Sequence, residues 1–340
     1  MINGRTRTAL WIVLLVAAAG AVVLFYVLPY VSHLQIPPGD DATFYVGAIR
    51  DVGKLGLVDP QVAARPAYPL IGAMLGSVSG TSAWVVTAGL SIALVVALGF
   101  AGAALAARWG LRGPGVAAFG FLAALSGVAA RLVAGKAENL MILALLAALL
   151  AVMAWADGPR RWAGMGALAV AAGLTEWPLM LGFVGIVGLD LVVRLVRRDM
   201  TSVREALPLA VAAGGGFAVA VVAILVGSHA TLAIRHLPGA ERYGPRLTLE
   251  LRLLLAPLTA ALVALGWWAA RRFRRHEVEG FRHLLTVWLV VTLLVTAVGL
   301  LGADFPSYRL LTFALPVVLA SAAAAFATIR RRRPDRCWGW

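Results

Sequence analysis

Apolar stretches of about twenty residues recur along the whole chain, with short polar segments between them. A helix needs about 20 apolar residues to cross about 30 Å of hydrocarbon. We therefore predict an all-α polytopic membrane protein with about ten transmembrane helices. The predicted spans are 9–31, 82–107, 114–133, 138–156, 162–175, 178–196, 205–227, 253–270, 284–302 and 309–329.

The charges that flank these spans predict the orientation of the chain. Arg5 and Arg7 precede a first apolar stretch that is too long for a cleaved signal peptide, which favours a signal anchor with a cytoplasmic N-terminus. The segments then assigned to the inner side carry a net charge of +13 and the outer ones +1, which together give the +14 of the chain. This bias follows the positive-inside rule. We predict a multi-pass protein of the plasma membrane with both ends in the cytoplasm.

Composition narrows the class further. The 61% of hydrophobic residues and a mean hydropathy of +0.88 exclude a soluble fold. The basic runs lie at span ends and lack interleaved aromatic residues, so we predict no nucleic-acid partner. The single cysteine, Cys337, provides neither a disulfide framework nor a thiolate metal cluster. We treat 1–340 as one transmembrane domain that ends in a basic cytoplasmic tail at 330–340.

Charged residues are almost absent from the interiors of the predicted spans. Asp190 is the main exception, and Arg194 stands at i+4, so an ion pair between them is the expected explanation. Ion-coupled transporters carry titratable or liganding groups near the middle of the membrane. The polar residues gather instead on the predicted outer side, in segments 32–81, 131–138, 228–252 and 303–309.

The first of these outer segments brings acidic, aromatic and basic residues together. Asp40 or Asp41 can cap a helix over about 40–54, and capping alone would explain one aspartate but leaves the second unused. Tyr45 stands at i+4 from Asp41, and Arg65 and Tyr68 follow before the next apolar stretch. The apolar positions that would let this helix lie in the membrane interface are Phe44, Val46, Ala48, Ile49, Val52 and Leu55.

The motif Asp41-Ala42-Thr43-Phe44-Tyr45, with Tyr68-Pro69 behind it, resembles the first outer loop of the GT-C superfamily of membrane glycosyltransferases. The protein mannosyltransferase, aminoarabinose transferase and mycobacterial mannosyltransferase branches are similar to it. The resemblance extends to a short re-entrant or interfacial segment at 70–81. It also covers an outer turn over 135–140 that contains Lys136 and Glu138, and Tyr308-Arg309 at the start of the last span.

The resemblance implies an inverting transfer of a sugar from a polyprenyl-phosphate donor to a lipid, glycan or protein acceptor at the outer face. Asp41 would be the general base that accepts the proton of the acceptor hydroxyl, with Asp40 as the alternative base. Negative charge grows on the leaving phosphate, so a cation must meet it there. The substrate-binding candidates are Tyr45, Arg65, Tyr68, Arg131, Lys136, Glu138, Arg246, Tyr308 and Arg309.

Several of these cations have a second explanation. Arg131 and Lys136 end spans, where their side chains can reach lipid headgroups. Arg309 can pair with Asp304. For Arg65 the sequence leaves open whether the side chain binds phosphate or has only a structural role. In the later outer loop, 228–252, a patch of charged residues and histidines is either a solvated connector or part of a donor site.

We assign no metal ligand and no certain cofactor. Some superfamily members bind a divalent ion at the loop acid, so that ion remains an alternative, although no HExxH motif or i,i+4 histidine pair is present. The run Gly214-Gly215-Gly216 lies within a predicted span and indicates close helix packing rather than phosphate binding. The alternative functions are a lipid or polysaccharide transporter or flippase, and a catalytically silent subunit of an envelope-synthesis complex.

Overall fold

The computed structural model describes residues 4–28, 42–56, 62, 65–108, 114–134, 137–155 and 158–227, with isolated positions between 264 and 294. The helices are α1 (Gly4–Val22), the π-helical turn η1 (Val23–Val27), α3 (Ala42–Leu55), α5 (Ala67–Ser79), α6 (Ala83–Arg108), α7 (Pro114–Ala134), α8 (Ala137–Trp155), α9 (Gly158–Thr175), α10 (Trp177–Val196) and α11 (Met200–Gly227). No strand occurs within these ranges.

Within the described residues, four helical segments are long and apolar enough to cross a membrane, namely Thr8–Val27, Ala83–Arg108, Trp177–Val196 and Met200–Gly227. This agrees with the predicted class of an all-α membrane protein. Helices also occupy the predicted spans at 114–133, 138–156 and 162–175. The predicted spans 253–270, 284–302 and 309–329 lie outside the continuous described ranges.

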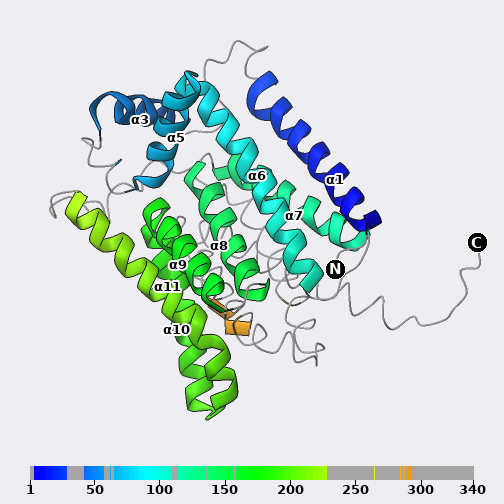
Figure 1. The fold of residues 1–340 in the computed structure, drawn as a ribbon, viewed down its shortest axis with the longest axis vertical. Coiled ribbons are helices and arrows are strands. Elements are labelled where there is room, and N and C mark those ends of the chain that lie inside the picture. Colours follow the sequence, from blue (N-terminus) through cyan, green and yellow to red (C-terminus); the bar gives the residue numbers. More distant parts are fainter. Residues whose placement is uncertain are drawn as a thin grey trace, which may run out of the picture.

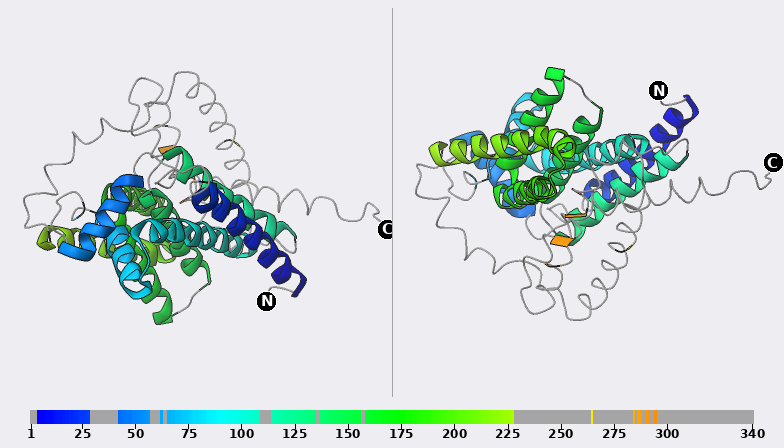
Figure 2. Two further views of the ribbon diagram at one scale, coloured as in Figure 1. Left: turned by 90° about the horizontal axis from the view of Figure 1, so that it is seen from above. Right: turned by 90° about the horizontal axis from the view of Figure 1, so that it is seen from below.

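Helix α8 lies at the centre of the described bundle. One apolar cluster joins it to α1, α6 and α7, and a second joins it to α9, α10 and α11. Figure 1 shows α1 beside α6 and α7, and α10 beside α11. The views from above and below in Figure 2 place α1 toward one side of the described helices and α11 toward the other. The sequence of α8 is apolar on all sides, and such a helix is expected to be buried at the centre of a bundle.

Close approach of helices depends on small residues. Gly99 of α6 and Gly120 of α7 face each other, and a Cβ built on Gly99 would lie 3.1 Å from the Gly120 carbonyl oxygen. Between α9 and α11 the same role falls to Gly216, whose built Cβ would lie 2.9 Å from the backbone nitrogen of Val170. Gly214 and Gly215 face open space. The interpretation of the glycine run as a packing feature is confirmed for Gly216.

Helices α3 and α5 pack across one end of the bundle, where α6, α8 and α10 begin; we call this the α3 end (Figure 1). The predicted helix over 40–54 is confirmed as α3, which begins at Ala42. Two of the side chains predicted to lie in the membrane interface, Ala48 and Ile49, are instead buried against protein, whereas Leu55 is 69% exposed. Contact with α5 and α6 therefore accounts for much of the apolar surface that was assigned to the membrane interface.

Helix α5 overlaps the segment 70–81 that is expected to be re-entrant or interfacial. At 13 residues it is too short to cross a bilayer. Gly80, with φ of 66°, ends it in the left-handed conformation and lets the chain turn into α6. One face of α5 carries exposed apolar side chains: Ile71, Met74, Leu75 and Val78.

Candidate functional site at the α3 end

Arg65 lies between α3 and α5 and is held by two carboxylates from distant parts of the chain. Its Nη1 is 3.4 Å from Oε2 of Glu138, and its Nε is 3.2 Å from Oε2 of Glu176. The arginine side chain is 28% exposed, whereas both glutamates are buried. Burial lowers the pKa of Arg65, but Glu176 and Glu138 outweigh it and hold that pKa above its ordinary value. The guanidinium therefore stays charged.

The positions of the two glutamates follow from local helix signals. Glu138 lies in the first turn of α8, where the helix dipole favours a negative group. Glu176 is the residue at which α9 ends and α10 begins, and Pro178 stands in the first turn of α10. Its backbone N–H still donates to the carbonyl of Ala172 at 3.0 Å. The break between the helices thus leaves this carboxyl pointing into the bundle end.

Burial of the Glu138 carboxyl group raises its pKa to about 8, although Arg65 opposes this shift and the nearby Glu176 carboxyl group adds to it. Two buried acidic side chains need a cation beside them, and Arg65 supplies that charge.

Two tyrosines complete the cluster. The Tyr45 hydroxyl of α3 hydrogen-bonds to Glu138, which connects α3 directly to α8. The rings of Tyr45 and Tyr68 meet edge to face, with centroids 5.2 Å apart. The Tyr68 hydroxyl donates to the carbonyl oxygen of Thr87 in α6 at 3.4 Å. Both tyrosines are almost completely buried, at 2% and 0% exposed.

We expect Tyr45→Phe to lower the free energy of unfolding by about 1–2 kcal/mol, because it removes a buried hydrogen bond to a carboxyl group. Thermal unfolding in detergent measures the change. Tyr26→Phe is the matched control, since Tyr26 is 37% exposed and contacts Trp84 through its ring. Equal stability of the two variants would contradict the hydrogen bond.

Four of the residues predicted from the sequence are thus brought together: Tyr45, Arg65, Tyr68 and Glu138. Arg131 lies in the last turn of α7. The remaining candidates fall outside the described residues; they are Asp40, Asp41, Lys136, Arg246, Tyr308 and Arg309.

The sequence interpretation missed two buried polar residues. Glu176 lies between the predicted spans 162–175 and 178–196, at a junction that the alternating topology places on the outer side with Arg65 and Glu138. Asn139, next to Glu138, is 0% exposed, and its amide has no hydrogen-bond partner within the described part of the chain. A polar residue at the border of an apolar span was the available signal for both.

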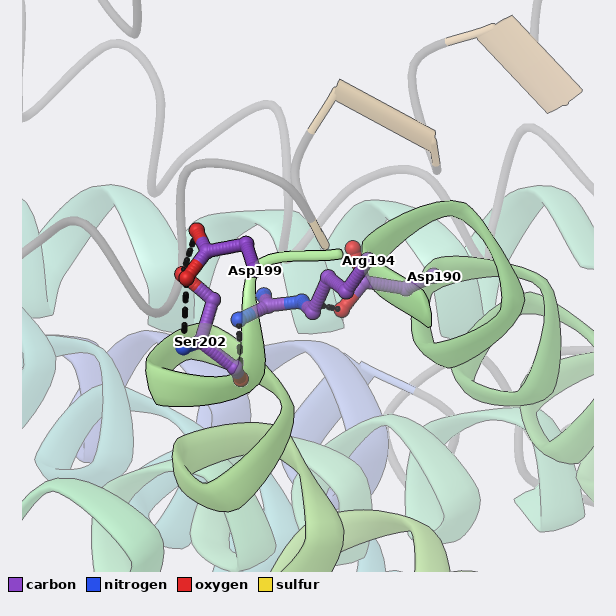
Figure 3. A network of polar contacts seen from close by, with 4 residues as sticks. All are labelled: Asp190, Arg194, Asp199 and Ser202. Atoms are coloured by element: carbon purple, nitrogen blue, oxygen red, sulfur yellow. Dashed lines mark hydrogen bonds and ion pairs between the residues drawn. The ribbon is translucent and has the colours of Figure 1, made fainter. Parts of the chain in front are cut away.

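A second polar network lies toward the opposite end of the bundle and ties α10 to α11 (Figure 3). Arg194 Nε donates to Oδ2 of Asp190 at 2.8 Å, and both side chains are buried, so the predicted ion pair is confirmed. Arg194 Nη1 also donates to the carbonyl oxygen of Ser202 at 2.8 Å. Asp199 caps α11 by accepting from the Ser202 backbone N–H at 3.1 Å.

Within the described ranges, no group of three or more histidine, cysteine, aspartate or glutamate side chains is arranged to hold a metal ion. Asp40 and Asp41, the acids at which a divalent ion was considered, lie outside those ranges.

Comparison with known proteins assigns no family to this arrangement. No protein-family model matches the chain, and neither a curated protein nor a solved structure matches it.

Proposed function

We propose that this chain is a membrane glycosyltransferase that moves a sugar from a polyprenyl-phosphate donor to an acceptor hydroxyl. In this proposal about ten spans carry the chain through the plasma membrane, both ends are cytoplasmic, and the α3 end faces outward. One observation supports it above the others. Helix α3 begins at Ala42, directly after Asp40-Asp41, and its Tyr45 is anchored in a buried polar cluster. A proposed base thus adjoins a fixed helix, as an active site requires.

Asp41 is the proposed general base and Asp40 the alternative. The base accepts the proton of the acceptor hydroxyl as its oxygen attacks the sugar carbon, and the bond from that carbon to the lipid phosphate breaks. The phosphate leaves with the bonding electron pair, so a cation must lie close to it. Arg131, Lys136, Arg246 and Arg309 are the proposed candidates. Arg65 is less suited, because a phosphate beside it would also face the carboxyl groups of Glu138 and Glu176.

We expect Asp41→Asn to lower the rate of sugar transfer about 10²-fold, since an amide cannot accept the hydroxyl proton. The assay uses membranes that contain the variant and a panel of labelled polyprenyl-phosphate hexoses and pentoses, with label counted in the acceptor fraction. Asp51→Asn is the control, because it makes the same chemical change at an exposed position of α3. Full activity in both Asp41→Asn and Asp40→Asn would exclude the proposed mechanism.

A lipid or polysaccharide transporter is the second candidate. The observation in its favour is the buried Asp190–Arg194 pair within α10, because charges inside membrane spans often mark a transport pathway. Translocation of labelled lipid by proteoliposomes that contain only this protein would support that function. A protein with neither activity would fit the third alternative, a silent subunit.

A further inference from the structure

Three segments that are remote in sequence meet at Arg65. The arginine precedes α5, Glu138 opens α8, and Glu176 separates α9 from α10. Tyr45 adds α3 through its hydrogen bond to Glu138. None of these contacts is local in sequence; Arg65 and Glu138, for example, are separated by 73 positions. The cluster is therefore complete only when α3 and α5 are seated on the bundle.

The charges of the cluster strongly disfavour a partly detached α3–α5 unit. Glu138 and Glu176 are 2% and 0% exposed, so if Arg65 withdrew, an acidic pair would remain buried without its cation. A buried charge that loses its partner is strongly unfavourable, whereas the completed cluster is satisfied. The guanidinium fork suits this position because it can reach two carboxyl groups at once, which a lysine ammonium does less well.

We propose that Arg65, Glu138 and Glu176 form a clasp that fixes the α3–α5 unit to the α3 end of the bundle. Arg65 is then a positioning residue and not a phosphate ligand. Through α3, the clasp also holds the helix that begins directly after the proposed bases, Asp40 and Asp41. Only this last step rests on the proposed glycosyltransferase function; the clasp itself does not.

The test compares hydrogen exchange in α3 between the wild-type protein and clasp variants in lipid nanodiscs. Glu138→Gln and Glu176→Gln each leave one carboxyl group to balance Arg65, so each is expected to have a small effect. The double variant leaves Arg65 without a carboxylate, and we expect exchange across 42–55 to rise at least about tenfold. Protection in α10 and α11 should stay at the wild-type level.

Arg65→Lys keeps the charge but not the fork, and it serves as the milder variant should the double variant fail to fold. We expect a smaller rise in α3 exchange, about threefold or more. Arg50→Lys is the matched control, because Arg50 is exposed on α3. Wild-type exchange of α3 in both Arg65→Lys and the folded double variant would overturn the clasp. The same would follow if the double variant failed to fold and Arg65→Lys exchanged as the wild type.

Sugar transfer by the same variants separates the clasp from the proposed function. If both hold, Arg65→Lys lowers kcat with little change in the KM for the donor, because it displaces the base without removing a donor contact. Faster α3 exchange with no transfer activity even in the wild type would keep the clasp and reject the enzyme. Loss of activity in Asp41→Asn together with unchanged α3 exchange in the clasp variants would support the enzyme and reject the clasp.

Discussion

Replacing Arg194 with methionine should lower the free energy of unfolding by about 3–5 kcal/mol, because it leaves the Asp190 carboxylate buried without its cation. Asp190 is 2% exposed, and the substitution also removes the donor to the Ser202 carbonyl. Unfolding of the purified protein by a denaturing detergent, followed by helical circular dichroism, measures the loss. Arg197→Met is the matched control, since Arg197 is exposed where α10 ends.

The double variant Asp190→Leu with Arg194→Met tests the reason for this loss. A buried ion pair can often be replaced by apolar side chains of similar volume at little cost. We therefore expect the double variant to recover most of the stability that Arg194→Met loses. If the double variant were as unstable as the single one, the loss would come from the Ser202 contact or from packing rather than from the unpaired carboxylate.

Gly216→Leu should destabilise the protein by about 3 kcal/mol, the upper part of the usual range for overpacking. A Cβ built on Gly216 already lies 2.9 Å from a backbone nitrogen of α9, and backbone cannot move aside as a side-chain end can. Gly215→Leu is the control, because its built Cβ meets nothing within 4 Å. The same unfolding assay applies, and a Gly215 variant that is as unstable as the Gly216 variant would refute the close contact.

The helices could be predicted from the sequence because burial in lipid leaves a strong and local signal. The expected spans at 82–107, 138–156 and 178–196 differ from α6, α8 and α10 by at most one residue at each end. The Asp190–Arg194 pair could be predicted for the same reason, since i,i+4 spacing alone brings the side chains together. The prediction of ten crossings goes beyond the four helices that, in the described part of the chain, meet the length and hydropathy needed to span a membrane.

The polar cluster could be predicted only in part. The sequence predicts Tyr45, Arg65, Tyr68 and Glu138 as members of one site, but which cation meets which carboxyl group depends on long-range packing. Glu176 was overlooked because a carboxyl group at a turn is usually solvated, and only the three-dimensional arrangement buries it. Phosphate binding by Arg65, which the sequence leaves as one of two open roles, stays a prediction in competition with the clasp.

The turn between α10 and α11 bears on how the chain is assembled in the membrane. Asp190 and Arg194 belong to the same helix, so their charges can neutralise each other as soon as α10 forms. The bond from Arg194 to the Ser202 carbonyl needs the first turn of α11 as well, and only Arg197, Arg198 and Asp199 separate the two helices. If α10 and α11 insert as one hairpin, Arg194 meets the Ser202 carbonyl at the same time as its Asp190 partner.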